Sequence, residues 1–296
     1  MGEVYLGRLI AAHGFERPVV IKTIRTELLA DERAALMFVD EARIAAGLHH
    51  RNILQIIDFD RFEGGAFLVT ELIDGCDLRK LLRHLRSPLR YDLALAIISE
   101  LATGLHAAHE AIGADGVTLG LIHRDVTPSN VLLGTYGEVK LADFGIARTR
   151  QRSYHTVSGT IKGKAAYMAP EQILGEPLDR RSDVFSLGVV LFEVTTRTRL
   201  YSATGDANAM RRILSGEVPD PAERRPDYPP ELAVIVRRAL ARERDARYQT
   251  AGAVVEALDA VAAARGWTMS RTAIGELVRS LLPRVRAKTP AGAGAA

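Results

Sequence analysis

Residues 123 to 145, HRDVTPSNVLLGTYGEVKLADFG, constrain this chain more than any other stretch. The runs VLL and EVKLA, with a glycine-containing turn between them, predict two paired strands. That hairpin joins a loop carrying Asp125 and Asn130 to a loop carrying Asp143, so we expect the three side chains to face one pocket. Phosphoryl transfer needs one acid that accepts a hydroxyl proton, and an acid and an amide that hold Mg²⁺ on phosphates. The stretch therefore predicts a phosphotransferase.

The order of short motifs resembles the protein kinases. HRD is followed after four residues by Asn130, then by DFG at 143–145 and APE at 169–171, which is the signature set of that family. Over about residues 2 to 264 the chain resembles the eukaryotic-like serine/threonine kinases of bacteria. This resemblance implies an α+β, bilobal fold with ATP between the lobes. The N-lobe (2–74) would hold a small antiparallel sheet and one helix, and the larger C-lobe (75–264) would be mainly helical.

Composition is ordinary for a soluble globular protein, with 47% hydrophobic and 25% charged residues. A net charge of +3 is too small to predict binding to nucleic acid or to a membrane surface. The single cysteine, Cys76, excludes an intrachain disulfide and fits a reducing compartment. The longest apolar run, at 184–194, is shorter than the ~20 residues that span a bilayer, and no secretory signal opens the chain. We expect a cytoplasmic protein without membrane insertion, with a buried helix at 184–194.

The first residues, MGEVYLG, resemble the end of a glycine-rich phosphate loop. The resemblance places Gly2 at the third glycine of that loop and Val4 over the adenine, whereas the first two glycines and the preceding strand are absent. A start codon placed too late, or a truncation, would account for this, and an ordinary first strand is the alternative. We expect the N-lobe sheet to lack one strand and to expose an unpaired edge.

Residues 18–24, PVVIKTI, match the family's V-A-I-K strand, with Val20 where alanine is usual. The resemblance implies that Val20 borders the adenine slot and that Lys22 holds the α- and β-phosphates. Glu41, on a helix predicted at 34–48, would pair with Lys22. Without the downstream motifs, Lys22 would be a solvated charge in a strand, and Glu41 would be a surface residue.

Further nucleotide contacts follow from the resemblance alone. Thr70 would be the gatekeeper, and the backbone of Glu71 and Ile73 would hydrogen-bond the adenine. Leu132 would form the floor under the adenine. Asp77 would bind the ribose hydroxyls, although capping of the helix that follows explains an aspartate there equally well.

The resemblance also assigns the catalytic roles. Asp125 would accept the proton of the substrate hydroxyl, while Asn130 and Asp143 would hold Mg²⁺, with Mn²⁺ as an alternative metal. Arg124 would receive a phosphate from the activation loop. That loop is the hydroxyl-rich, basic segment between DFG and APE, which outside a kinase would be an ordinary solvated loop. Its candidate phosphosites are Thr156, Ser158 and Thr160.

Two positions depart from the family pattern. Position 127 is threonine where serine/threonine kinases have a lysine that neutralises the γ-phosphate, and the usual glycine-threonine pair reads Gly163-Lys164. In the family those two positions meet beside the catalytic aspartate. We therefore expect Lys164 to supply the cation missing at position 127; a solvent-exposed Lys164 is the alternative.

Three late residues match structural positions of the C-lobe. Asp183 resembles the buried aspartate that braces the catalytic loop, although helix N-capping alone would also justify it. Arg247 resembles the arginine that pairs with the APE glutamate, Glu171. These matches distinguish the chain from small-molecule phosphotransferases that share the core of the fold.

The remaining chain reads as an amphipathic helix at 265–286 and a disordered tail at 287–296. The helix has one apolar face, which we expect to pack on the C-lobe; docking of a partner protein is the alternative. Its apolar residues are Ile274, Leu277, Val278, Leu281, Leu282 and Val285.

The sequence thus predicts transfer of the γ-phosphoryl group of Mg·ATP to serine or threonine hydroxyls of protein substrates. A homodimer would allow phosphorylation of one activation loop by another copy. Tyrosine specificity is less favoured, although the missing lysine at position 127 weakens the usual sequence criterion for serine/threonine kinases. The rival from another class is a pseudokinase that binds nucleotide or acts as a scaffold, supported by the incomplete phosphate loop and by the altered pair at positions 127 and 164. Against it stands the intact set Lys22, Glu41, Asp125, Asn130 and Asp143.

Overall fold

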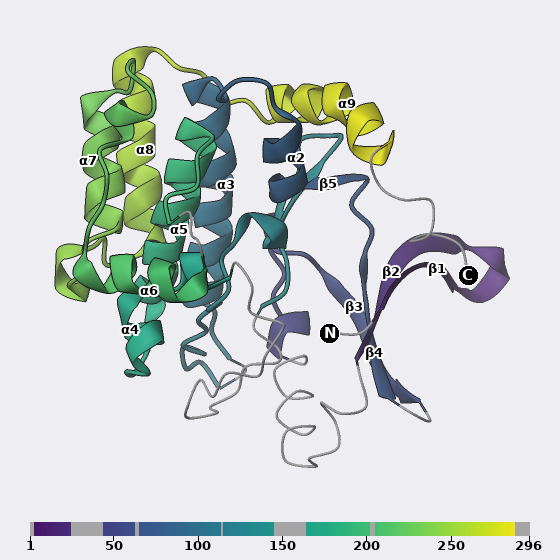
Figure 1. The fold of residues 1–296 in the computed structure, drawn as a ribbon. Coiled ribbons are helices and arrows are strands. Elements are labelled where there is room, and N and C mark those ends of the chain that lie inside the picture. The colour runs from purple at the N-terminus through teal and green to yellow at the C-terminus, as the bar shows by residue number, and fades with distance from the viewer. Residues whose placement is uncertain are drawn as a thin grey trace.

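The computed structural model describes residues 3–24, 44–62, 65–113, 115–144, 164–201 and 205–287. A twisted sheet forms one lobe and a bundle of helices forms the other (Figure 1). Several predicted features lie outside the described residues: Gly2, Glu41 with most of the helix expected at 34–48, Thr156, Ser158, Thr160 and nearly all of the tail expected at 287–296.

The N-lobe sheet is antiparallel, in the order β1-β2-β4-β3. Its strands are β1 (Val4–Ile10), β2 (Glu16–Ile24), β3 (Ile56–Phe62) and β4 (Gly65–Glu71). Within the described residues β1 forms an edge, and Leu6 and Ile10 on it are 74% and 71% exposed. The register places Lys22 of β2 between Val4 of β1 and Leu68 of β4. Lys22 therefore lies on a strand flanked on both sides.

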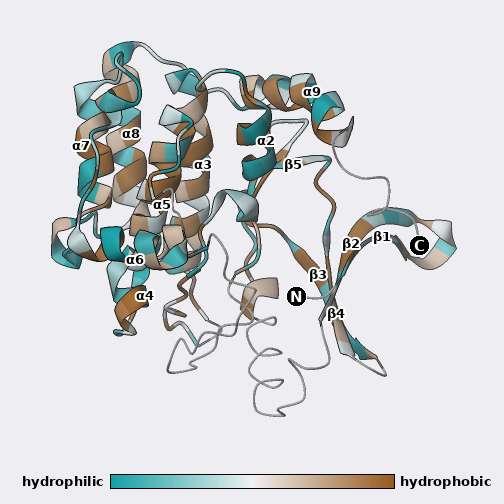
Figure 2. Ribbon diagram, in the orientation of Figure 1, coloured by the Kyte–Doolittle hydropathy of each residue, from teal (hydrophilic) through white to brown (hydrophobic). Residues whose placement is uncertain are grey.

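The C-lobe is built around α3 and α5, which pack on each other. Its helices are α2 (Leu78–His84), α3 (Tyr91–His109), α4 (Pro170–Leu174), α5 (Arg180–Thr196), α6 (Asp206–Ser215), α7 (Pro230–Ala239), α8 (Ala251–Arg265) and α9 (Arg271–Ala287). Hydrophobic stripes run along α3, α7 and α8 beside hydrophilic ones (Figure 2). One cluster of buried side chains joins these helices into a single core.

Helix α5 contains the apolar run at 184–194 and is buried nearly all around, as expected for a helix without a polar face. The Asp179 carboxylate caps it by accepting a hydrogen bond from the Arg181 backbone N–H at 2.8 Å. Gly188 lets α5 approach α7 closely, because a Cβ there would lie 2.8 Å from the Cβ of Ala239. In the part of the chain that the structure describes, no helix combines the length and apolarity needed to cross a bilayer.

A second, three-stranded sheet lies between the lobes, in the order β5 (Gly75–Asp77), β6 (Val131–Gly134) and β7 (Val139–Leu141). Strands β6 and β7 are the hairpin that the sequence predicts, and Gly137 in their turn adopts a φ of 86°, which favours glycine. Backbone hydrogen bonds at 2.8 and 2.9 Å tie Leu141 of β7 to Asn52 and Leu54, ahead of β3. This sheet therefore connects the loops at its ends to both lobes.

Candidate active site

Asp125 and Asn130 are in direct contact on the loop that precedes β6. A 3-10 turn at Pro128–Asn130 leads into β6. The Asn130 amide Nδ2 donates to the Asp125 main-chain oxygen at 2.8 Å and to its carboxylate Oδ2 at 3.1 Å. Across the hairpin, the Ala142 backbone N–H donates to the Asn130 carbonyl at 2.8 Å. The residue before Asp143 is thereby fixed to the loop that carries Asp125.

Asp143 meets Lys22 of the N-lobe sheet. The Lys22 ammonium donates to Asp143 Oδ1 at 2.6 Å, between side chains that are 21% and 32% exposed. Asp143 has a φ of 58°, a left-handed conformation that few non-glycine residues adopt. Such strained backbone is retained chiefly at functional sites. The ion pair joins the two lobes where the sequence analysis expects phosphates.

Lys164 lies beside Asp125. It directly precedes a 3-10 turn, Ala165–Tyr167, and its Nζ donates to Asp125 Oδ2 at 2.6 Å. The Lys164 side chain is 33% exposed, and that of Asp125 only 10%. Thr127 is buried in the same loop, with its hydroxyl unpartnered among the described residues. This is the contact that the Thr127/Lys164 exchange requires, and its catalytic role stays a prediction.

A buried aspartate holds the backbone of the catalytic loop. Asp183, at the start of α5, accepts hydrogen bonds from the backbone N–H groups of His123 and Arg124 at 2.7 and 2.8 Å. His109 at the end of α3 contacts the same carboxylate at 2.8 Å. Burial alone would raise the pKa of Asp183, but the interaction with His109 and the backbone donors outweighs it and leaves that pKa below its ordinary value. Asp183 is therefore held as a carboxylate.

His123 links the same loop to the strand before Asp143. The ring is fully buried, and its Nε2 lies 3.1 Å from the Ala142 carbonyl, to which it donates. Burial lowers the pKa of His123, which keeps the imidazole neutral. Asp183, His123 and Asn130 therefore fix the loops of Asp125 and Asp143 relative to each other.

Glu171 and Arg247 form a fully buried pair below this loop. The guanidinium donates to Glu171 at 2.7 and 2.9 Å in a bidentate arrangement. Its other N–H groups reach the carbonyls of Arg181, Ala241 and Arg242 at 2.7 to 3.0 Å. All five donors of Arg247 are thus satisfied, as burial of a charge requires.

The residues expected to surround the adenine lie on β2, β4, β6 and the segment after β4. Val20 is opposite Thr70 in the sheet, and Leu132 on β6 is opposite Asp77. The Glu71 carboxylate accepts a hydrogen bond from Lys140 at 2.8 Å. The hydrogen bond expected between the Glu71 backbone and the adenine stays a prediction. Ile73 lies in the segment between β4 and β5.

Asp77 caps α2, as one of the two readings of the sequence predicts. Its carboxylate accepts a hydrogen bond from the Lys80 backbone N–H at 2.8 Å. Contact with a ribose stays a prediction. Val4, at the start of β1, is paired with Lys22 and is 57% exposed.

Sequence reasoning assigned no role to two contributors to this site. His109 carries no motif of its own, although its position on the buried face of α3 marks it as a histidine needing a partner. Asn52 is buried, and its amide donates to Glu100 at 2.5 Å and to the Val139 carbonyl of β7 at 3.0 Å. Both contacts join segments at least 48 residues apart, so the sequence does not show which partners these side chains meet.

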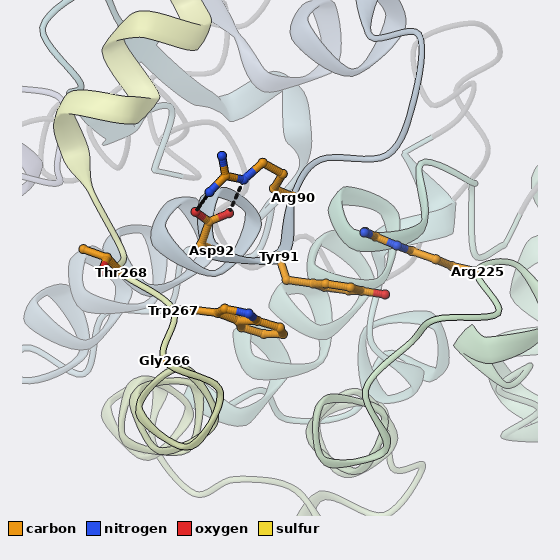
Figure 3. Close-up of a pocket in the computed structure, with 7 residues that line it drawn as sticks. All are labelled: Arg90, Tyr91, Asp92, Arg225, Gly266, Trp267 and Thr268. Carbon is orange, nitrogen blue, oxygen red and sulfur yellow. Dashed lines mark hydrogen bonds and ion pairs between the residues drawn. The ribbon is translucent and has the colours of Figure 1, made fainter.

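A cavity of about 370 Å³ opens elsewhere, at the start of α3 (Figure 3). Tyr91 and Trp267 stack there with ring centroids 5.2 Å apart, and the Arg225 guanidinium lies 3.6 Å from the Tyr91 ring centre. None of the residues that line it belongs to the Asp125 site. The stack of Tyr91 on Trp267 fastens the segment between α8 and α9 to α3.

Comparison with known proteins decides the family. Residues 1–257 match the family model described as protein tyrosine and serine/threonine kinase. The chain belongs to the protein kinase family. The predicted family and the predicted bilobal α+β fold are therefore confirmed. The kinase domain of PknI from Mycobacterium tuberculosis has the same fold, with a TM-score of 0.66, 27% identity, and coverage of 88% of this chain and 91% of that one.

The related kinases carry names of both specificities. The chain is 42% identical over 262 residues to the tyrosine-protein kinase MasK of Myxococcus xanthus, covering 88% of this chain and 41% of MasK. It is 36% identical over 258 residues to the serine/threonine-protein kinase PknB of Mycolicibacterium smegmatis, covering 85% of this chain and 39% of PknB. The kinase therefore spans about two fifths of the length of these curated relatives.

Proposed function

We propose that this kinase transfers the γ-phosphoryl group of ATP to serine or threonine hydroxyls of proteins. The observation that carries the proposal is the pair of contacts at the hairpin, Lys22 with Asp143 and Lys164 with Asp125. Two cations and two carboxylates converge there from the N-lobe sheet, the two catalytic loops and the segment before APE. A scaffold protein has no chemical need for this arrangement.

Nucleotide binding would use the N-lobe side of the site. Lys22 would bind the α- and β-phosphates, while the backbone at Glu71 and Ile73 would read the adenine. Asn130 and Asp143 fit a magnesium ion because Mg²⁺ prefers carboxylate and amide oxygens. The Asn130 NH₂ group already donates to Asp125, so its oxygen is the atom left for a metal. Bound Mg²⁺ would supply charge neutralisation for the phosphates.

The hydroxyl of the substrate would bind at Asp125. Two donors, Lys164 Nζ and Asn130 Nδ2, hold the Oδ2 atom of its carboxylate, so the orientation of this side chain is set before substrate arrives. Asp125 would orient the hydroxyl and accept its proton. Lys164 would remain close enough to stabilise the negative charge of the transferring phosphoryl group.

Regulation by the activation loop is part of the proposal. Arg124 has a φ of 65°, and its backbone is held by Asp183 and by the Gln172 side chain, which donates to its carbonyl at 3.0 Å. A phosphate on the activation loop would form charge-assisted hydrogen bonds with the Arg124 guanidinium. Phosphorylation of one copy by another would supply that phosphate.

Tyrosine specificity is the second candidate because the relative MasK is named a tyrosine kinase. The serine/threonine proposal is supported by the motif pattern and by two relatives that are named serine/threonine-protein kinases, PknB and the PknL of Mycobacterium tuberculosis. Phosphoamino acid analysis distinguishes the two. The kinase would be incubated with radiolabelled ATP, Mg²⁺, casein and a glutamate-tyrosine copolymer, with Asp125→Asn as the control.

Phosphoserine or phosphothreonine that disappears in Asp125→Asn would support the proposal. Phosphotyrosine alone would assign the kinase to the second candidate. ATP binding without transfer to any acceptor would favour the pseudokinase.

A further inference from the structure

Helix α9 is packed beside the hinge, which is the segment of residues 71–77 that leads from the end of β4 through β5. It contacts α2, β5 and β6, and lies above α2 and β5 in Figure 1. It begins at Arg271, after the segment that the Trp267–Tyr91 stack fastens to α3. Its inner face belongs to the main core through five side chains that are at most 7% exposed: Ile274, Val278, Leu281, Leu282 and Val285. The helix is therefore part of the folded domain.

Helix α9 touches the β6–β7 turn directly, through Gly275, Arg279 and the backbone of Arg271, whose carbonyl oxygen lies where a Cβ on Gly137 would be. Gly275 and Arg279 are four positions apart and so share one face of the helix. The Arg279 guanidinium donates to the Thr135 carbonyl. A Cβ on Gly275 would lie 2.7 Å from the Thr135 carbonyl oxygen and 2.9 Å from the Gly137 nitrogen. Only glycine allows the helix to lie this close to the backbone of the turn.

The same turn is bonded to the hinge. The Thr135 backbone N–H donates to the Asp74 carbonyl at 2.8 Å, and its hydroxyl lies 3.5 Å from the Asp74 carboxylate. Strand β5 continues directly from Asp74 and pairs with β6. Asp74 directly follows Ile73, whose backbone we propose as an adenine contact. Thr135 is thus held from one side by α9 and holds the hinge on the other.

We propose that α9 is a positioning element for nucleotide binding, with Gly275 and Arg279 as its positioning residues. They fix Thr135, which in turn fixes Asp74 and the hinge that would read the adenine. This inference rests on the proposed function, because it assumes that the hinge binds ATP. It assigns to the C-terminal helix a role in ATP affinity and none in the transfer step.

The test uses the full chain and one substitution that removes only the donor. Arg279→Met keeps the length and apolar stem of the side chain but removes its hydrogen bond. Arg284→Met is the matched control, since Arg284 is an exposed arginine of the same helix. Three quantities are measured: the amide hydrogen exchange of residues 71–77, the KM for ATP, and kcat.

The proposal predicts at least threefold faster hinge exchange and at least a threefold higher KM for ATP in Arg279→Met, with kcat within twofold of wild type. The Arg284→Met control should leave all three quantities unchanged. Unchanged hinge exchange and unchanged KM would overturn the proposal, as would a fall in kcat without a change in KM. A wild-type chain that binds no MgATP would overturn the proposed function as well, and the hinge exchange would still show whether α9 fixes the hinge.

Gly275→Ala is a second test, because its effect on stability has opposite signs depending on whether Gly275 is an ordinary helical glycine or is required by the close contact with the turn. Alanine has a higher helix propensity than glycine, so an ordinary helical glycine would gain stability on this change. The close contact predicts the reverse: a lower melting temperature and the same faster hinge exchange as Arg279→Met. Higher stability with unchanged exchange would show that α9 does not depend on this contact.

Discussion

Replacement of Lys164 by methionine is the sharpest perturbation of the candidate active site. It keeps the length of the side chain and removes the ammonium that donates to Asp125 Oδ2 at 2.6 Å. The backbone of Lys164 forms the start of a 3-10 turn and does not depend on the charge. The variant should therefore fold normally and lose catalytic rate.

The expected magnitude follows from the burial of the two side chains. Hydrogen bonds to charged groups contribute about 1.5–3 kcal/mol. Lys164 is 33% exposed, so solvent screening favours the lower half of that range, about 1.5–2 kcal/mol. Because each 1.4 kcal/mol changes a rate about tenfold, kcat should fall by roughly 10- to 30-fold.

The assay is steady-state phosphorylation of casein at saturating ATP. Lys164→Arg retains a cation and should recover part of the rate. Arg211→Met on α6 removes an exposed positive charge and should leave the rate unchanged. A loss of less than about threefold in Lys164→Met, with a melting temperature equal to that of wild type, would refute the role of Lys164.

Three further substitutions test the contacts that support the site. Glu171→Gln leaves the buried Arg247 without a carboxylate and should cost about 3–5 kcal/mol of unfolding free energy at pH 7. Burial opposes ionisation of Glu171, but the hydrogen bonds from Arg247 prevail and lower its pKa below the ordinary 4.5. The stabilisation by this carboxylate is thus complete above pH 4.5 and is lost as pH falls through the lowered pKa. The difference in unfolding free energy between wild type and Glu171→Gln, measured with urea, should therefore be smaller at pH 4 than at pH 7. An equal difference at the two pH values would contradict this. Asp183→Asn retains one acceptor where the carboxylate serves several buried donors, so it should cost about 1–3 kcal/mol, seen as a melting point several degrees lower. Gly104→Ala places a Cβ 2.8 Å from the Asn52 carbonyl and should lower the melting temperature despite its better helix propensity; a higher one would show that this contact relaxes freely.

Local patterns predicted the elements of the site well. The β6–β7 hairpin follows from two short apolar runs around a glycine turn, and the buried helix expected at 184–194 lies within α5. Boundaries were less accurate. The helix expected at 265–286 begins only at Arg271, because Gly266 adopts a φ of 64° that ends α8. Pro283 remains inside α9.

Contacts between distant segments could not be read from the sequence. The Lys22–Asp143 pair spans 121 residues, and Arg279 reaches Thr135 across 144. Family resemblance suggests that Lys22 and Asp143 share a site, whereas nothing in the sequence of the C-terminal helix indicates the contact between Arg279 and Thr135. An amphipathic pattern shows that a helix has a buried face, but the surface that covers this face depends on the whole fold.

Transfer of phosphate by Asp125 is the central claim, and comparison of binding with turnover tests it most directly. MgATP affinity and the rate of γ-phosphoryl transfer to casein would be measured for wild type and for Asp125→Asn. The account predicts similar ATP affinity in both proteins and a transfer rate at least 100-fold lower in the variant, as expected when a positioned general base is lost. Equal transfer by both proteins, or ATP binding by wild type with no transfer, would contradict it.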